Sequence, residues 1–250
     1  MRSPFAADPG RASDVLVTLG ALAEERGTGS AGLALLGGAP GLGGRAAGDG
    51  CRVVEGRGRF SGVWRPGLLP ELDRAAVALG HTRRAGAAGG EPILRLLAGR
   101  RTTGEITGVL GALAGGVALA WVERDRPTEV HLARGELSPL AMAVDTDQNI
   151  YWASDPRWLR EAERHTRVRF ATVVLLREGT YMRVGMERRP GRRDRPEVLA
   201  SAAFVPARCT GTDPRVLTGF TPAGAEGGRD DLLHTVAARA GGAGGLLTVA

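Results

Sequence analysis

The chain has 250 residues, which is enough for one sizeable hydrophobic core or for one domain with a tail. Apolar residues make up 43% of it, an ordinary share for a globular protein, whereas 39 glycines are many and 4% aromatic residues are few. The net charge of +6 comes from 33 basic residues, all arginine, without any nucleic-acid recognition motif. We therefore expect arginines scattered over a solvated surface and no nucleic-acid partner.

The two cysteines, Cys51 and Cys209, stand in unrelated contexts and show no metal-ligand spacing. This predicts no bound metal, no other cofactor and a reducing cytoplasm. No apolar run approaches the roughly 20 residues that span a bilayer, and the first residues lack the apolar stretch of a signal peptide. The sequence thus predicts a cytoplasmic protein without membrane contact.

Helical and strand patterns alternate through the first half of the chain. Ser13 or Asp14 is predicted to cap a helix that Gly27 ends. Strands are predicted over residues 31–36, 51–54 and 77–81, with a glycine-rich loop over 37–50. Short helices are predicted over 71–73, 93–97 and 104–113, the last capped by Thr103.

The second half is predicted to be rich in strands. These cover residues 117–122, 130–133, 140–144 and 150–153, and a helix capped by Ser154 or Asp155 follows them. A final hairpin is predicted from strands 173–176 and 181–184 around Gly179. Asp145, Asp147 and Asn149 imitate the start of a calcium loop but lack its glycine and its closing glutamate, so a hairpin turn is predicted there.

Beyond residue 186 the composition changes. Residues 188–196 form a charged, proline-punctuated run that is typical of a linker. The remainder is rich in Gly, Ala and Pro, and only residues 230–240 have a helical pattern. We expect one domain over residues 1–186, followed over 187–250 by an Arg/Pro/Gly-rich linker and a mostly disordered tail.

Antiparallel strands interleaved with helices favour an α+β layered fold. Five short strings, in order along the chain, then resemble the class II glutamine amidotransferase domain, of the kind found in glucosamine-fructose-6-phosphate aminotransferases. The resemblance covers about residues 11 to 185. The strings are Arg26-Gly27-Thr28-Gly29-Ser30-Ala31-Gly32, Gly80-His81-Thr82-Arg83, Gly115 to Val122, His131-Leu132-Ala133-Arg134 with Ser138-Pro139-Leu140, and Ile150-Tyr151-Trp152-Ala153-Ser154-Asp155.

This resemblance implies the fold of the N-terminal-nucleophile hydrolases, a four-layer αββα sandwich, here truncated and incomplete at its N-terminus. The implied reaction releases ammonia from glutamine for transfer to an acceptor. In that family an N-terminal cysteine attacks the amide and its own α-amine moves the proton. An arginine binds the α-carboxylate of glutamine, an aspartate binds the α-ammonium, and an Asn-Gly pair stabilises the oxyanion.

The residues present do not support this reaction. The chain begins Met1-Arg2-Ser3-Pro4, so the nucleophile has no counterpart, and Cys51 lies inside the chain without an adjacent base. We therefore name no catalytic residue and expect Cys51 to be a part-buried residue at a strand start.

Other parts of the implied site are altered as well. The short stretch Gly86–Gly90 replaces the segment that carries the Asn-Gly pair and the ammonium-binding aspartate, and Gly29 replaces an acidic residue. By resemblance alone, Arg83 and Arg26 are the candidate substrate-binding residues. A planar guanidinium suits a carboxylate, but a structural or surface role is the alternative for Arg83. His81 is expected to make a structural hydrogen bond, and neither His131 nor His165 has a second ligand at metal spacing.

Three functions stay open at this stage. The first is an inactive structural or regulatory homologue, a pseudoenzyme, that binds glutamine, self-associates or pairs with an intact homologue. The second is a glutamine-hydrolysing domain whose true N-terminal cysteine lies upstream of a misassigned start. The third is nucleic-acid binding through the arginine-rich linker, which is the least favoured.

Two structural expectations follow from the missing first strand and from the apolar pattern. Residues 31–36 should lie beside an uncovered sheet edge and promote self-association, and amide protons should exchange fast across Ala31–Val54. The strands from Val117 to Val184 should form the most stable part, with Trp121 and Trp152 in or near the core.

Overall fold

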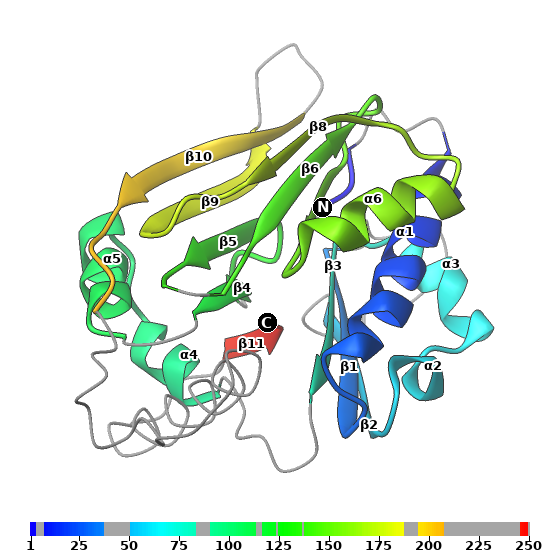
Figure 1. Cartoon of the computed structure of the whole chain (residues 1–250), viewed down its shortest axis with the longest axis horizontal. Coiled ribbons are helices and arrows are strands. Elements are labelled where there is room, and N and C mark those ends of the chain that lie inside the picture. The colour runs from blue at the N-terminus through cyan, green and yellow to red at the C-terminus, as the bar shows by residue number, and fades with distance from the viewer. Residues whose placement is uncertain are drawn as a thin grey trace.

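A computed structural model describes residues 1–3, 8–37, 51–83, 91–113, 117–123, 125–136, 138–187, 195–207 and 246–249. It contains helices and several antiparallel sheets, as the α+β interpretation predicts (Figure 1). The segments 38–50 and 84–90, on which we predicted a glycine-rich loop and the altered part of the site, lie outside the described residues. So does the predicted helix over residues 230–240.

The first sheet has three antiparallel strands in the order β2 (Cys51–Arg57), β1 (Ser30–Leu36) and β3 (Val77–Arg83). β1 is therefore the central strand, and its side chains from Ala31 to Leu36 are buried on both faces. The expectation that residues 31–36 border an uncovered edge is wrong, because β2 and β3 pair with both sides of β1. The strands themselves lie where their apolar pattern predicts them.

A second sheet has the order β7 (Ile150–Ala153), β6 (Ala141–Asp145) and β8 (Phe170–Leu175). The turn between β6 and β7 is a hairpin, as predicted, and Gln148 adopts a left-handed φ of 65° within it.

The third sheet has five strands in the order β10 (Arg195–Ala203), β9 (Thr180–Glu187), β5 (Glu129–Arg134), β4 (Ala118–Glu123) and β11 (Leu246–Val249). The predicted hairpin of residues 173–184 is wrong. β8 pairs with β6, whereas β9 pairs with β5 and β10, so the two strands belong to different sheets. The expectation of a linker and a disordered tail is also wrong for β10 and β11, which complete this sheet at both edges.

Helices cover the outer faces of the sheets. On one side lie α1 (Pro9–Leu22), the short α2 (Phe60–Val63) and α3 (Leu69–Leu72), and α6 (Pro156–His165); on the other lie α4 (Glu91–Leu97) and α5 (Thr103–Gly111) (Figure 1). Single 3-10 turns follow α1 and precede α3, at Ala23–Glu25 and Pro66–Leu68.

The helix ends follow side-chain capping. α1 begins before the predicted Ser13 or Asp14, because the Asp8 carboxylate caps it by accepting from the Gly10 N–H. Asp155 caps α6 as predicted. Thr102, not Thr103, caps α5, through a capping box with Glu105.

Three apolar cores separate these layers. The central one joins side chains of β1 and β3 to side chains of β4, β5 and β9, and Ala34, Leu79, Ala120 and Leu132 belong to it. A second core lies between the five-stranded sheet and α4 and α5, and Trp121 is 1% exposed in it. A third packs α1 and α6 on β6 and β7. Trp121 is in the core, as predicted, and Trp152 is partly buried against the central one.

Candidate functional site

The N-terminus lies in the middle of the molecule, between β3 and β7 (Figure 1). The Met1 amino group donates to the Ile150 carbonyl at 2.7 Å, and the Ile150 N–H donates to the Met1 carbonyl at 2.9 Å. On the other side, the Arg2 N–H donates to the Ala76 carbonyl at 2.7 Å. The first residues therefore occupy the position of a strand between two others, running antiparallel to β7.

A buried polar network in the β6–β7 hairpin holds this segment. The Ser3 N–H donates to Oδ1 of Asn149 at 2.7 Å. The Asp145 carboxylate accepts from the Asn149 N–H, from its Nδ2 and from the Tyr151 hydroxyl, at 2.7 to 2.8 Å. Asp145 and Asn149 are 2% and 1% exposed, so both side chains are buried with their hydrogen bonds made. The acidic turn that imitates a calcium loop thus anchors the N-terminus.

An open slot continues this strand position beyond the Met1 amino group. It is a cavity of about 130 Å³ between the edges of β3 and β7. α1 forms one wall, through apolar and small side chains such as Leu16, Leu19 and Gly20. The five-stranded sheet forms the opposite wall, through Ala118 and Ala120. We call this cavity the β3–β7 slot.

The far end of the slot brings together parts of three of the strings quoted above. Arg26, Thr82, Ser154 and Trp158 line it there, and they come from the end of the first helical region, the end of β3, the loop before α6 and α6 itself. The Arg26 guanidinium carbon lies 5.9 Å from the Trp158 ring centroid, a cation–π distance. The Thr82 hydroxyl donates to the Ala23 carbonyl at 2.5 Å.

The two candidate substrate-binding residues are therefore placed differently. Arg26 lines the slot. Arg83 ends β3 directly after Thr82 but is not among the lining residues, and its carbonyl accepts from the Gly29 N–H at 2.7 Å. Its charge nevertheless acts on the neighbouring His81, because burial and the Arg83 guanidinium lower the pKa of that imidazole.

Burial has a strong effect on the N-terminal amine. Burial and, to a smaller extent, the adjacent Arg2 charge lower the pKa of the Met1 α-amino group from the usual 8.0 to about 5, while Asp145 opposes the shift. The amine is therefore neutral at pH 7. A neutral α-amine can accept a proton, but the Met1 side chain carries no group that could act as a nucleophile.

Arg2 carries polar atoms that the fold leaves unsatisfied. Its Nη2 donates to the Leu72 carbonyl at 2.9 Å and to the Ser13 hydroxyl at 3.2 Å. Its Nε and Nη1 are buried without hydrogen-bond partners. Burial lowers the pKa of Arg2, whereas Asp73 and Tyr151 raise it. Met1 and Arg2 line the slot, and sequence reasoning missed both, because no local pattern shows that a chain end lies between two distant strands.

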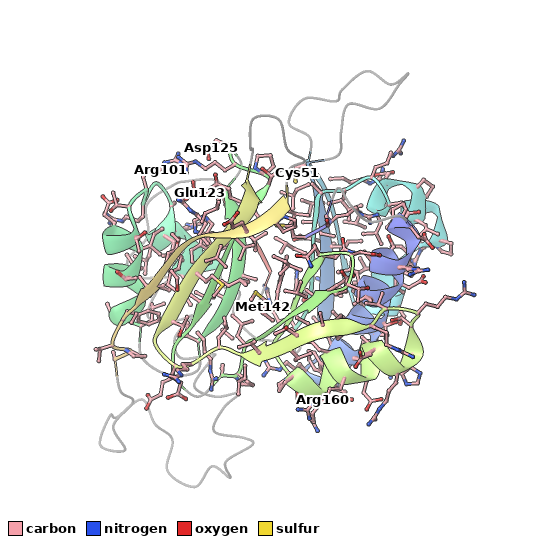
Figure 2. The ribbon with its side chains drawn as sticks, turned by 90° about the horizontal axis from the view of Figure 1, so that it is seen from above. Cys51, Arg101, Glu123, Asp125, Met142 and Arg160 are labelled. Carbon is pink, nitrogen blue, oxygen red and sulfur yellow. The ribbon has the colours of Figure 1, made fainter. Side chains whose placement is uncertain are left out.

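The remaining candidates lie apart from the slot or take structural roles. Cys51 is part-buried at the start of β2, as predicted, and β1 and β3 separate it from the slot in sheet order. Figure 2 labels Cys51 at the upper edge of the molecule in that view. His81 lines the slot but packs on Gly32, and its Nδ1 has no hydrogen-bond partner, so the predicted structural hydrogen bond is not made through that atom.

His131 is buried on the other side of the five-stranded sheet. Its Nδ1 lies 2.9 Å from the Tyr181 hydroxyl, and its ring stacks on Trp121 with centroids 4.8 Å apart. Burial, Arg183 and Arg126 lower its pKa from 6.5 to about 4, so the ring is neutral at pH 7. His165 lies at the exposed end of α6.

Neither a metal cluster nor a membrane-spanning helix occurs among the described residues. In this part of the chain, no group of three or more His, Cys, Asp and Glu side chains could hold a metal ion. Within the same ranges, none of the helices is long and apolar enough to cross a membrane.

Comparison with known proteins assigns no family. No protein-family model matches the chain, and no curated protein matches it. Among solved structures, it is similar to one described as the allosteric regulatory enzyme of purine biosynthesis, with 15% sequence identity and a TM-score of 0.49. The likeness covers 78% of this chain and 48% of that one, so this chain spans about half the length of the solved protein. A likeness at this level assigns neither an activity nor a partner.

Proposed function

We propose that this chain is a glutamine amidotransferase-like domain that, with Met1 as its first residue, does not hydrolyse glutamine and acts as a structural or regulatory homologue. The observation that carries the proposal is the slot. It gathers Arg26, Thr82 and Ser154 from three of the strings that resemble this family, beside an N-terminus without a nucleophile.

The layer order supports the finer part of the fold proposal. Four layers follow one another, with an apolar core between successive layers. They are helices α1 and α6, then a sheet surface formed by β1, β3, β6 and β7, then the five-stranded sheet, and then helices α4 and α5. We take this order as support for an αββα sandwich of the N-terminal-nucleophile hydrolase type.

The geometry also argues against a substitute nucleophile. Cys51 belongs to β2, three strand positions from the slot. With strands about 4.8 Å apart, this places it roughly 14 Å away. A thiol cannot attack an amide over that distance, and Cys209 lies outside the described residues.

The first prediction is therefore an absence of glutaminase activity. Purified protein incubated with glutamine should release ammonia no faster than buffer in a coupled assay, because nucleophile and oxyanion donors are missing; one lost oxyanion donor alone costs about 10²–10³ in rate. Cys51→Ser is the matched control. Turnover above background that Cys51→Ser abolishes would overturn the proposal.

Ligand binding without turnover tests the regulatory part. If Arg26 binds a carboxylate, glutamine should bind measurably by calorimetry, and Arg26→Ala should weaken the binding more than Arg83→Ala does, since only Arg26 lines the slot. Self-association or pairing with an intact homologue remains part of this proposal, as does a cytoplasmic location.

A second candidate is a glutamine-hydrolysing domain with its nucleophilic cysteine upstream of Met1. The observation that favours it is the room left in the slot between the Met1 amine and Ser154. The genomic bases before the start codon, together with the N-terminal mass of the native protein, decide between the two candidates.

A further inference from the structure

The outer edges of the sheets differ in how well they are protected against pairing with a further strand. Charged residues, prolines and bulges protect such edges in natural proteins. β10 carries Pro196 and a bulge between Val198 and Ala200, and β2 carries charged residues such as Arg52 and Glu55. β8, at the edge of the sheet β7-β6-β8, has neither a charged residue nor a proline, and no strand in the described part of the chain pairs with its outer side.

The outer edge of β8 offers the main-chain groups of Val173 and Leu175. The Leu176 N–H donates to the Leu140 carbonyl at 2.9 Å, so the main-chain groups of Leu176 face β6. Because these directions alternate along a strand, the groups of Val174 also face β6, whereas Val173 and Leu175 direct theirs outward. The register shift of β8 against β6 lies nearer the start of β8, so this stretch is regular.

The side chains beside these groups are apolar and exposed. Val173, Val174 and Leu175 are 38%, 42% and 48% exposed. Successive side chains of a strand point to opposite faces of its sheet, so this edge is apolar on both faces. Figure 1 shows β8 at the upper margin of the molecule. A strand placed along β8 would therefore bury apolar surface on both faces as well as form main-chain hydrogen bonds, and exposed apolar patches of this kind mark interaction sites.

An arginine stands at each end of β8. Arg169 directly precedes the strand, and its Nη1 donates to the carbonyls of Glu163 and Val168, at 2.9 and 3.3 Å, but to no carboxylate. Arg177 follows the strand and is exposed, and in the described part of the chain it has no ion-pair partner. Both guanidinium groups are therefore available to an acidic group on another molecule.

The acidic side chains near the two ends are already engaged. Oε1 of Glu163 accepts from the Phe170 N–H at 3.0 Å. Oε1 of Glu178 lies 3.6 Å from Nη2 of Arg134, which neutralises it. The two arginines thus exceed the one remaining carboxylate, and the surroundings of β8 carry a net positive charge.

This charge decides which kind of strand suits the edge. A second copy of this chain, paired antiparallel to β8 about Val174, would bring Arg169 of each copy towards Arg177 of the other. Like charges at both ends oppose that pairing. An apolar segment with an acidic residue at each end has complementary charge in either strand direction, because both ends of β8 are positive.

We propose that the outer edge of β8 is a docking site for a partner protein, which inserts an extended apolar segment flanked by acidic residues. The segment adds a fourth strand to the sheet β7-β6-β8 and bonds to the main chain of Val173 and Leu175. Its acidic side chains lie beside Arg169 and Arg177. β8 does not line the β3–β7 slot, so this proposal and the proposed function fail separately.

The test uses the peptide acetyl-Asp-Val-Thr-Val-Thr-Val-Asp-amide as the probe, and its matched control has Lys in place of both Asp residues. In excess probe, amide exchange of Val173 and Leu175 should slow at least about tenfold, because the added strand accepts from both N–H groups. Exchange of Val174 should change less, because its N–H already faces β6. The Lys peptide should bind at least about tenfold more weakly than the probe.

Charge reversal in the protein provides the second measurement. The double variant Arg169→Glu/Arg177→Glu should prefer the Lys peptide over the probe, because the ends of β8 become acidic. The control Arg65→Glu/Arg74→Glu makes the same change of charge at exposed positions near α2 and α3, and it should keep the preference for the probe. Amide exchange of β4, measured in the same spectra, shows that each variant is folded.

Four outcomes would overturn the proposal. Unchanged exchange of Val173 and Leu175 in excess probe would exclude a docking strand, and equal protection by both peptides would exclude the acidic chemistry of the partner. Slow exchange of these two amides without peptide, together with a dimer in sedimentation equilibrium, would show that a second copy covers the edge. Protection by vesicles of anionic lipid, but not by the probe, would assign the surface to a membrane.

Discussion

Trp121, His131 and Tyr181 form a cluster of three buried rings on neighbouring strands β4, β5 and β9. The ring centroids are 4.8 to 6.2 Å apart, and α4 and α5 cover them. The tryptophan was predictable from the apolar strand pattern, but the histidine was not, because an alternating polar residue in a strand is as often exposed as buried. Its burial follows from the helices packed on that face.

Trp121→Ala should be strongly destabilising. The side chain is 1% exposed, and its removal leaves a cavity that α5 cannot fill, so the free energy of unfolding should fall by about 3–5 kcal/mol in urea melts. Trp152→Ala, at a partly buried position, should cost less. A loss below about 1 kcal/mol for Trp121→Ala would contradict its role in the core.

The neutral His131 predicts a dependence of stability on pH. Its folded-state pKa is about 4, below the usual 6.5, so the unfolded chain binds more protons between these values and stability falls as the pH drops through this window. Between these two pKa values His131 lowers the free energy of unfolding by a total on the order of 3 kcal/mol. The Met1 amine acts in the same direction between pH 8.0 and about 5.

Urea melts between pH 7 and 4 check the histidine contribution. His131→Gln should flatten the pH dependence of the free energy of unfolding, because it removes the buried ring whose pKa is lowered. If the free energy of unfolding of His131→Gln depended on pH as steeply as that of the wild type, protonation of this ring would not be the cause of the loss of stability in acid.

At the scale of elements, local signals placed most helices and strands. The start of α5 was predicted one residue too late, at Thr103, although the capping box of Thr102 and Glu105 spans only four consecutive residues. Strand partners were less predictable. β8 and β9 are consecutive strands with a Glu178-Gly179 turn between them. They nevertheless belong to different sheets, because β8 pairs with β6 and β9 pairs with β5.

The position of β1 gives an element-scale prediction that reverses our expectation from sequence. Because β2 and β3 flank it, amide protons of Ala31–Leu36 should exchange as slowly as those of β4. The outer edge of β2, which has no partner strand in the described part of the chain, should exchange faster. Fast exchange across Ala31–Leu36 in native-state hydrogen-exchange measurements would contradict this strand order.

At the scale of the whole molecule, the five-stranded sheet joins segments that are far apart in sequence. β11 pairs with β4, although more than half the length of the chain separates the two strands in sequence. β10 comes from a region whose composition predicted a linker. A Gly-, Ala- and Pro-rich composition indicates little intrinsic structure, but a strand edge that is already folded supplies the hydrogen bonds that such a segment needs. Figure 2 shows this sheet, with Glu123 of β4 near Arg101 and Asp125 at its end. Arg101 forms ion pairs with Glu123 at 2.5 Å and with Asp125 at 2.9 Å.

The sequence by itself determined the class of fold and the order of most elements, because caps, turns and apolar periodicity act over a few residues. The tertiary structure alone decided which strands are neighbours. It placed Val77–Arg83 and Ile150–Ala153 on either side of the N-terminus and left the slot between them. Such pairings join residues that are far apart in the sequence, Arg2 with Ala76 and Met1 with Ile150, and local patterns carry no information on them.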